Sequence, residues 1–372
     1  MASIKAMVDL RAAIRKKYGD EALVPTEDES VPIPVIPTGS ILLDVALGIG
    51  GFPRGRLIEL YGAPSSGKST LALSTAAQAQ KMGGHVLYLD HEHAFDPTYA
   101  EVIGVDLSED KWTLAQPSTA EEGLGIAEMF IENKMAILVI GDSLAAMVPK
   151  KQLEGEIGDI YVAIKARLMS TTLERLTPKI SKAGAVFLFI NHTREIINTM
   201  PGRTKKKTTP GGTALKFYSS IRVEVIPIES IKGKVVNPVS GLQEDGNQAI
   251  KVKAIVVKNK TSRPFRSGTF YLENGLCEAR TILEVAVARG IVAQNGSRFV
   301  LPFTTEGTDK RVNIAGKEGT LQWLKDNPDK YERLRCKIIE VLQTKVDAEP
   351  IVDIDDEKKE VSFMATALSE EV

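Results

Sequence analysis

Residues 62–69 read Gly-Ala-Pro-Ser-Ser-Gly-Lys-Ser, and they constrain this chain more than any other stretch. Their spacing fits G-x-x-x-x-G-K-[ST], a loop whose backbone N–H groups wrap around a phosphate chain. The two glycines let the backbone curl, Lys68 supplies a positive charge, and the Ser69 hydroxyl can ligate Mg²⁺. The residues that we assign to this nucleotide-binding loop are Gly62, Ala63, Pro64, Ser65, Ser66, Gly67, Lys68, Ser69 and Thr70.

The flanks of the loop agree with this interpretation. Residues 55–61 carry the aliphatic residues of a buried strand, and residues 70–82 are rich in Ala, Leu and Gln, which favours a helix. A phosphate loop needs this order of strand, loop and helix, and the helix N-terminus adds its dipole to the anion site. The alternative is a Gly/Ser-rich turn with a surface lysine, which accounts for neither flank.

The bulk composition excludes several classes of protein. The chain has 372 residues, 43% of them hydrophobic, which suffices for one large domain and one or two small ones. Its net charge is −1, so a polyanionic partner has to be met by local patches. Cys277 and Cys336 fit neither a disulfide framework nor a metal-ligand spacing. We find no apolar run of membrane-spanning length and no signal-peptide pattern, so we expect a soluble cytoplasmic protein without a membrane partner.

Apolar runs in the middle of the chain predict an α/β core. Residues 85–90, 136–142 and 185–191 are short apolar stretches, each ending in a polar residue and separated from the next by helical stretches. Such runs are typical of parallel strands that are covered on both faces, and ligands collect at their carboxyl ends. The polar residues expected beside the phosphate loop are therefore Asp90, Glu92, Asp142 and Asn191. Residues 221–226 and 249–257 are expected to close the sheet in antiparallel fashion, with a hairpin or loop over 232–247.

The ends of the chain have a different organisation. Residues 4–18 predict a short amphipathic helix, and the proline-punctuated residues 21–37 predict an extended linker. The predicted divisions are 1–37, an oligomerisation helix and linker; 38–267, the core; 268–346, a small α+β C-terminal domain; and 347–372, a disordered acidic tail. The C-terminal domain is expected to hold helices at 278–289, 317–324 and 329–343 and a strand at 298–303.

Two carboxylates near the loop suggest hydrolytic chemistry. Asp142 ends an apolar strand, as the Walker B aspartate of a phosphate-loop enzyme does, and with Ser69 it could ligate Mg²⁺. The alternative for Asp142 is a cap on the following turn. Glu92 lies just past a strand end, where it could polarise a water molecule, although an isolated carboxylate there is more often simply solvated. His91 and His93 flank it without a third metal ligand.

A basic stretch follows the strand at 185–191. Its positive residues are Arg194, Arg203, Lys205, Lys206 and Lys207, and Gly211 and Gly212 follow them. The stretch leaves a strand that also faces the nucleotide site, so its conformation can depend on the nucleotide. It suggests a contact with a nucleic acid backbone; the alternative is a basic surface loop without a binding role.

These blocks together resemble the bacterial RecA recombinase family. The resemblance rests on Pro37–Ser40, Leu43–Gly48, Pro64–Ser69, Glu92–Pro97, Glu154–Asp159, Gly211–Gly212, Ala214–Tyr218, Val256–Lys260 and Trp323–Pro328. It runs in order along essentially the whole chain. It implies a RecA-type phosphate-loop ATPase core with a mostly parallel central sheet, an N-terminal helix-strand polymerisation segment and the small C-terminal domain.

The resemblance also implies roles for individual residues. Glu92 corresponds to the glutamate that activates the attacking water, and Asp96 and Tyr99 correspond to adenine-contacting positions. Residues 154–167, including Arg167, overlap the first DNA-binding loop, and residues 194–209 the second. Lys258 and Lys260 correspond to lysines that reach the γ-phosphate of the neighbouring subunit. The implied cofactors are ATP and Mg²⁺.

Two departures from the family pattern stand out. Ala63-Pro64 replaces the usual Pro-Glu of the phosphate loop, and His192 replaces the usual glutamine that senses the γ-phosphate. The phage recombinase UvsX is similar at Asn191-His192, so a cellular and a phage origin both stay open.

The leading hypothesis is a DNA-dependent ATPase that forms a helical filament on single-stranded DNA. It would pair that strand with homologous duplex DNA and exchange strands in recombination and repair, with loader or single-stranded-DNA-binding proteins as candidate partners. The alternatives are a RecA-fold ring helicase and a DNA-coating protein that binds ATP but barely hydrolyses it.

Overall fold

The computed structural model describes residues 2–19, 22–23, 32–156, 164–195, 207–236, 243–304 and 310–346. The chain divides into two compact units, residues 1–34 and 35–372. The first unit holds helix α1 (Ala2–Tyr18), which confirms the predicted N-terminal helix. The predicted acidic tail at 347–372 lies outside the described residues.

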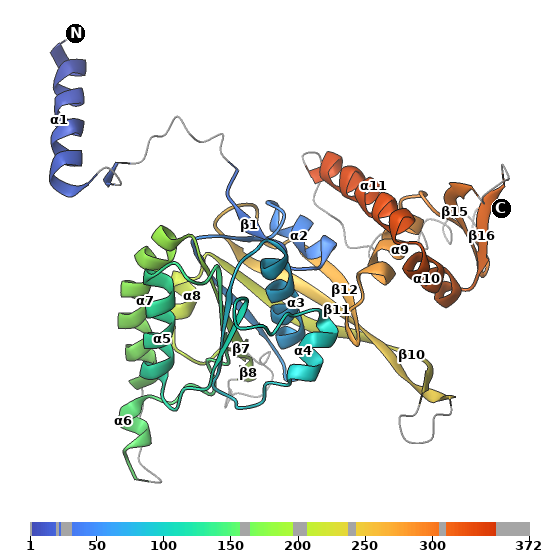
Figure 1. Cartoon of the computed structure of the whole chain (residues 1–372), viewed down its shortest axis with the longest axis horizontal. Helices are drawn as coiled ribbons and strands as arrows, with labels where there is room; N and C mark the ends of the chain where they lie inside the picture. Colours follow the sequence, from blue (N-terminus) through green and yellow to red (C-terminus); the bar gives the residue numbers. More distant parts are fainter. Residues whose placement is uncertain are drawn as a thin grey trace, which may run out of the picture. The chain divides into compact units, whose positions relative to one another are not determined.

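A nine-stranded sheet forms the centre of the second unit (Figure 1). In spatial order its described strands are β13 (Gly275–Leu276), β12 (Ser267–Glu273), β11 (Gln243–Asn259), β10 (Ile221–Val236), β3 (Arg56–Gly62), β7 (Val186–His192), β6 (Leu138–Asp142), β4 (Val86–Asp90) and β5 (Trp112–Ala115). Pairing is parallel from β10 through β3, β7, β6 and β4 to β5, and antiparallel from β10 to β13. The predicted mostly parallel α/β sheet is therefore confirmed.

Helices cover both faces of the sheet, because its central strands are apolar on both sides. On β7, Leu188 and Ile190 join one buried cluster with α3, while Phe187 and Phe189 join another with α5 and α7. The helices of the core are α2 (Ile41–Leu47), α3 (Lys68–Lys81), α4 (Pro97–Ile103), α5 (Ala120–Glu132), α6 (Lys150–Leu153), α7 (Ile164–Ala183) and α8 (Ala214–Tyr218). Figure 1 shows α5 and α7 on one face and α3 and α4 on the other.

Parallel pairing brings distant segments to one edge of the sheet. Gly62 at the end of β3 pairs with His192 at the end of β7, and Asp90 at the end of β4 pairs with Asp142 at the end of β6. The phosphate loop and these polar strand ends therefore share one edge, as the sequence predicted.

The hairpin of β10 and β11 decides between the two structures predicted for residues 232–247. β10 runs to Val236 and β11 begins at Gln243, so the described part of this range is a paired hairpin and not an unpaired loop. The expectation that residues 221–226 and 249–257 would pair in antiparallel fashion is confirmed by β10 and β11, and on its other side β10 pairs with β3 in parallel. Three register shifts interrupt the pairing, between Arg222 and Val223, between Pro227 and Glu229, and between Ile231 and Lys232.

The C-terminal region has its own buried cluster, to which α2 contributes Ile41 and Leu42. Its elements are α9 (Glu278–Ala288), β14 (Ala293–Asn295), β15 (Arg298–Thr304), β16 (Arg311–Ala315), α10 (Lys317–Asp326) and α11 (Pro328–Val346). The predicted helices and β15 are confirmed, whereas β14 and β16 were not predicted. Because β12 and β13 extend the central sheet, the sheet continues past residue 267 to Leu276.

Two short pairings complete the described structure. β1 (Val35–Ile36) pairs with β2 (Phe52–Pro53), and β8 (Arg194–Glu195) pairs with β9 (Lys207–Thr208). Among the described residues, no helix combines the length and the hydropathy that crossing a membrane requires.

Candidate active site

The phosphate loop joins the end of β3 to the start of α3, so the predicted strand, loop and helix are present. Gly67 begins the helix in the left-handed region, with φ +91°, and a Cβ there would lie 2.3 Å from Leu272 Cδ1. A Cβ on Gly62 would lie 2.3 Å from the backbone oxygen of Val225. Both loop glycines therefore occupy positions that no larger residue fits.

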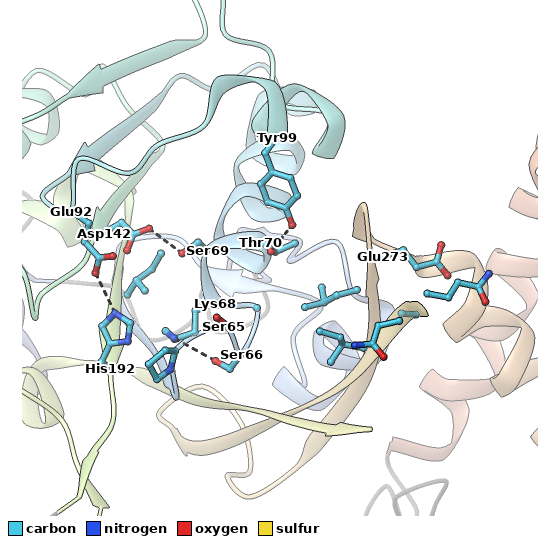
Figure 2. Close-up of a pocket in the computed structure, with 18 residues that line it drawn as sticks. Ser65, Ser66, Lys68, Ser69, Thr70, Glu92, Tyr99, Asp142, His192 and Glu273 are labelled. Atoms are coloured by element: carbon cyan, nitrogen blue, oxygen red, sulfur yellow. Dashed lines mark hydrogen bonds and ion pairs between the residues drawn. The ribbon is translucent and has the colours of Figure 1, made fainter. Parts of the chain in front are cut away.

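Lys68 lies almost fully buried inside the loop. Its Nζ donates to the Ala63 carbonyl at 2.7 Å and to Ser66 Oγ at 3.4 Å (Figure 2). Burial lowers the pKa of Lys68, while the nearby carboxylates Asp142 and Glu92 raise it. The ammonium group is thus held by one loop carbonyl and one loop hydroxyl, at the position where the motif requires a cation for phosphates.

Ser69 and Asp142 form the candidate Mg²⁺ site. Ser69 Oγ donates to Asp142 Oδ2 at 3.0 Å, and Tyr88 Oη donates to the same oxygen at 2.6 Å. Burial raises the pKa of Asp142. A hydroxyl and a carboxylate this close are the hard oxygen ligands that Mg²⁺ prefers, with phosphate oxygens and water completing the shell. The described residues include no cluster of three His, Cys, Asp or Glu side chains fit to hold a metal alone.

Glu92 lies beside this pair, and two side chains hold it. Ser143 Oγ donates to Glu92 Oε1, and His192 Nε2 lies 3.2 Å from the same oxygen (Figure 2). The other ring nitrogen of His192, Nδ1, is buried and has no hydrogen-bond partner in the described structure. Sequence reasoning missed Ser143, although its place directly after Asp142 at a strand end could have pointed to it.

The residues expected to contact adenine occupy different places. Tyr99 Oη lies 2.8 Å from Thr70 Oγ1, so the ring borders the phosphate loop (Figure 2). Asp96 caps helix α4, because its side chain accepts from the Tyr99 backbone N–H at 3.1 Å. Tyr99 lines the nucleotide cavity described next, whereas Asp96 is not among its lining residues.

A cavity of about 510 Å³ opens over the phosphate loop. Loop residues 64–70, Glu92, Tyr99, Asp142 and His192 line one part of it. The remaining lining residues are Ile190, Asn247, Gln248, Ala249, Ile250, Leu272 and Glu273. Sequence reasoning missed those from β11 and β12, because no motif marks them and only the fold of the sheet brings them here.

The residues expected to bind DNA are described only in part. Arg167 is exposed on α7, Arg194 is exposed on β8, and Gly211 and Gly212 have positive φ angles directly before α8. Arg203, Lys205 and Lys206 lie outside the described residues, and only the backbone of Lys207 is described.

Lys258 and Lys260 do not line the cavity of their own chain. Lys258 Nζ donates to the backbone oxygens of Lys216 and Phe217, at 2.6 Å and 2.9 Å, at the C-terminal end of α8. Burial, with the neighbouring charges of Lys260 and Arg222, lowers the pKa of Lys258.

Comparison with known proteins adds an independent finding. The model of the RecA N-terminal domain matches residues 5–276. "Protein RecA" of Saccharopolyspora erythraea is 41% identical over 352 residues, which cover 93% of this chain and 95% of that protein. "Protein RecA" of Kineococcus radiotolerans is 42% identical over 357 residues, covering 95% of this chain and 97% of that protein. The crystal structure of the RadB recombinase is 23% identical with a TM-score of 0.45, over 65% of this chain and 98% of that one.

Proposed function

The chain belongs to the RecA family, and we propose that it is an ATP-hydrolysing recombinase. It would assemble as a filament on single-stranded DNA, pair that strand with homologous duplex DNA and exchange strands. One observation supports the hydrolytic part best. The phosphate loop, the Ser69–Asp142 pair and Glu92 meet at one sheet edge around a cavity of about 510 Å³.

The nucleotide side of the proposal follows from this geometry. ATP would supply the phosphate bond that is cleaved, and Mg²⁺ would neutralise negative charge on the phosphate oxygens. The loop N–H groups and Lys68 hold the phosphates, and Ser69 and Asp142 supply oxygen ligands for Mg²⁺. The ring of Tyr99 would contact the adenine base. The left-handed Gly67 places the first N–H groups of α3 at the phosphate site.

Glu92 is the proposed general base. Both described hydrogen bonds to its carboxylate end on Oε1, from Ser143 and from His192. These bonds orient the side chain and leave Oε2 to accept a proton from a water molecule. His192 lines the same cavity, and its ring would contact the γ-phosphate and so link the nucleotide to the second loop.

The DNA side of the proposal rests on positive charge and on family position. Arg167, Arg194, Arg203 and the lysines at 205–207 would contact the phosphate backbone, with Gly211 and Gly212 at the end of the second loop. Lys258 and Lys260 would complete the site of a neighbouring protomer, which agrees with their distance from the cavity lining of their own chain.

The domain division also stays a proposal, with one change. We propose an assembly segment at 1–37, a core that extends to Leu276 because the sheet does, and a C-terminal domain from Cys277 to Val346.

A single substitution tests the proposed base. Glu92→Gln keeps the side-chain size and removes the proton acceptor, so we expect ATP turnover to fall at least about a hundredfold. ATP-dependent binding to single-stranded DNA should persist. The measurements are steady-state phosphate release and fluorescence anisotropy of a labelled oligonucleotide. Glu109→Gln, at an exposed position before β5, is the matched control.

A normal turnover rate in Glu92→Gln would contradict the role of Glu92. A strand-exchange assay with ATP, a single-stranded circle and homologous linear duplex tests the recombinase proposal directly. Joint molecules that require both ATP and homology support it. ATP turnover without joint molecules would instead favour a DNA-stimulated ATPase of another kind, such as a ring helicase.

A further inference from the structure

Three residues that follow Asp142 contact Glu92 of the candidate active site, Lys165 of the first predicted DNA loop and Gly211 after the second. They follow the end of β6, and we call them the 143–145 segment: Ser143, Leu144 and Ala145. At its first residue the Ser143 hydroxyl donates to Glu92 Oε1. At its second residue the Leu144 N–H donates to the Ile190 carbonyl of β7 at 3.0 Å. The segment is therefore tied to the proposed base and to the strand that carries His192.

Lys165 holds the same segment from the side of the first loop. It is the second residue of α7, directly after the undescribed residues 157–163 of the first loop. Its Nζ donates to the Ala145 carbonyl at 2.8 Å and lies 3.4 Å from the Leu144 carbonyl. The side chain is half-buried, and burial together with the charge of Arg194 lowers the pKa of Lys165.

The end of the second loop contacts the segment directly. A Cβ on Gly211 would lie 2.5 Å from Leu144 Cδ2, and a Cβ on Gly212 would lie 2.8 Å from the Cβ of Ala166. The glycine backbone thus packs against Leu144 and against the residue next to Lys165. Contacts this close transmit displacement, because packed atoms cannot move independently.

We propose that Lys165 is a positioning residue that couples the first DNA loop to Glu92 through the 143–145 segment; this proposal rests on the proposed function. A DNA contact at the first loop would restrain the start of α7, and through Lys165 the carbonyls of Leu144 and Ala145. Ser143 would then present its hydroxyl to Glu92 Oε1 in one orientation. Without that contact Glu92 would be aligned less often.

A direct role of Lys165 in binding DNA is the competing explanation, and the geometry opposes it. The ammonium group already donates to two carbonyls in the protein interior, and withdrawing it would leave those oxygens without their cation. Arg167, two residues later, is exposed and available for the phosphate backbone.

The test compares turnover and DNA affinity in the same full-length variants. Lys165→Met keeps the length and apolar stem of the side chain but removes the donor. In the presence of saturating single-stranded DNA we expect kcat for ATP to fall about tenfold or more, with a change in DNA affinity below about threefold. Lys165→Arg restores a donor and should recover most of kcat. Lys151→Met, at an exposed lysine of α6, is the matched control.

A double-mutant cycle adds a readout that a general structural role would not affect. Ser143→Ala removes the hydroxyl at the other end of the same path, so its effect on kcat and that of Lys165→Met should not add. Additive effects would overturn the proposed path. Thermal unfolding of every variant checks that the fold is retained.

The outcomes separate the inference from the function on which it rests. If the wild-type protein shows ATP turnover that DNA does not stimulate, the proposed function fails and the inference fails with it. If DNA stimulates the wild type and Lys165→Met equally, only the inference is overturned. A loss of kcat that parallels an equal loss of DNA affinity also overturns it, because Lys165 would then be a DNA contact.

Discussion

Asp44 illustrates how a single residue can make stability depend on pH. Its Oδ1 accepts from the Thr38 backbone N–H at 2.8 Å and so fixes the chain before α2. Burial raises the pKa of Asp44 from 3.8 to about 7. The negative charge of Glu278 raises this pKa further, and the positive charge of Arg335 lowers it. Between these two pKa values the folded protein binds one more proton here than the unfolded chain does.

The sign of the effect follows from this difference. The contribution of Asp44 to stability is complete below pH 3.8 and is lost as the pH rises to about 7. A pKa change of this size corresponds to a change in unfolding free energy on the order of 4 kcal/mol. We expect Asp44→Asn to gain stability relative to the wild type as the pH rises from 5 to about 7, and no further above it. Urea unfolding at each pH measures this difference.

Asp110→Asn, at an exposed aspartate, is the control and should keep the pH dependence of the wild type. An Asp44→Asn variant whose unfolding free energy runs parallel to that of the wild type from pH 5 to pH 8 would show that the carboxyl is ionised throughout.

The sequence predicted best those site residues whose placement depends on the local backbone alone. The loop motif placed Lys68 and Ser69, and the strand ends placed Asp142 and Glu92, because backbone geometry alone determines those positions. The partners of Glu92 were not predictable in the same way. His192 reaches it only because β7, β6 and β4 follow one another in the sheet, and no local sequence pattern determines this strand order.

At the scale of elements, Arg280 joins three parts of the C-terminal half. It is 2% exposed and lies on α9. Its Nε donates to Glu273 Oε1 of β12 at 2.8 Å, and its two terminal nitrogens donate to the carboxylate of Glu318 on α10 at 3.0 Å and 3.2 Å. The central sheet and the C-terminal helices therefore share one buried guanidinium group.

Replacing Arg280 by an uncharged residue should destabilise the folded protein, because its guanidinium group forms ion pairs with two carboxylates. We expect Arg280→Met, which keeps most of the volume, to lower the free energy of unfolding by about 2–4 kcal/mol. The reason is that Glu273 stays partly buried beside an apolar side chain and loses its counter-charge. Guanidinium unfolding followed by circular dichroism measures the effect.

Arg333→Met, on the exposed face of α11, provides the comparison and should change the free energy by less than about 0.5 kcal/mol. Equal stability of the two variants would mean that the ion pairs of Arg280 contribute nothing net to the fold.

Element boundaries show why part of the fold escaped prediction. Helices α3, α9 and α10 were predicted from composition and periodicity, which act within one element. For the far part of β10 and β11 the sequence left a hairpin and a loop open, because Gly and Asn residues suggest turns unless a partner strand holds them. Arg280 lies on a predicted helix, but a charged residue gives no sequence signal for burial when both of its partners come from other elements.

At the scale of the whole molecule, the first unit presents apolar side chains to solvent. On α1, Ile4 is 72% exposed, Met7 50% and Val8 58%. Residues 4, 7 and 8 share one helix face, and an exposed stripe of this kind is typical of an interaction site. Together with the family assignment, this favours a contact between successive protomers of a filament.

We expect Ile4→Asp combined with Met7→Asp to abolish filament assembly, because two charges would have to be buried at the contact. ATP binding by the isolated protomer should stay within about twofold, since the cavity lies in the second unit. Light scattering with single-stranded DNA and nucleotide titration measure the two properties.

Asp9→Asn combined with Lys16→Ala, seven residues apart on the side of α1 away from Ile4 and Met7, is the control. Filaments of normal length from the Ile4/Met7 variant would show that another surface carries the assembly.

The two tryptophans of this chain lie in different parts of the molecule, and their placement has a practical consequence. Trp112 packs against Tyr88 and Phe95, with ring centroids 5.5 Å and 5.4 Å apart, and Tyr88 donates to Asp142 at 2.6 Å. Trp323 lies on α10 against Phe303. A Trp323→Phe protein would therefore keep a single tryptophan, one aromatic ring away from the Asp142 carboxylate of the candidate Mg²⁺ site. Its emission offers a label-free optical signal for events at the catalytic edge of the sheet.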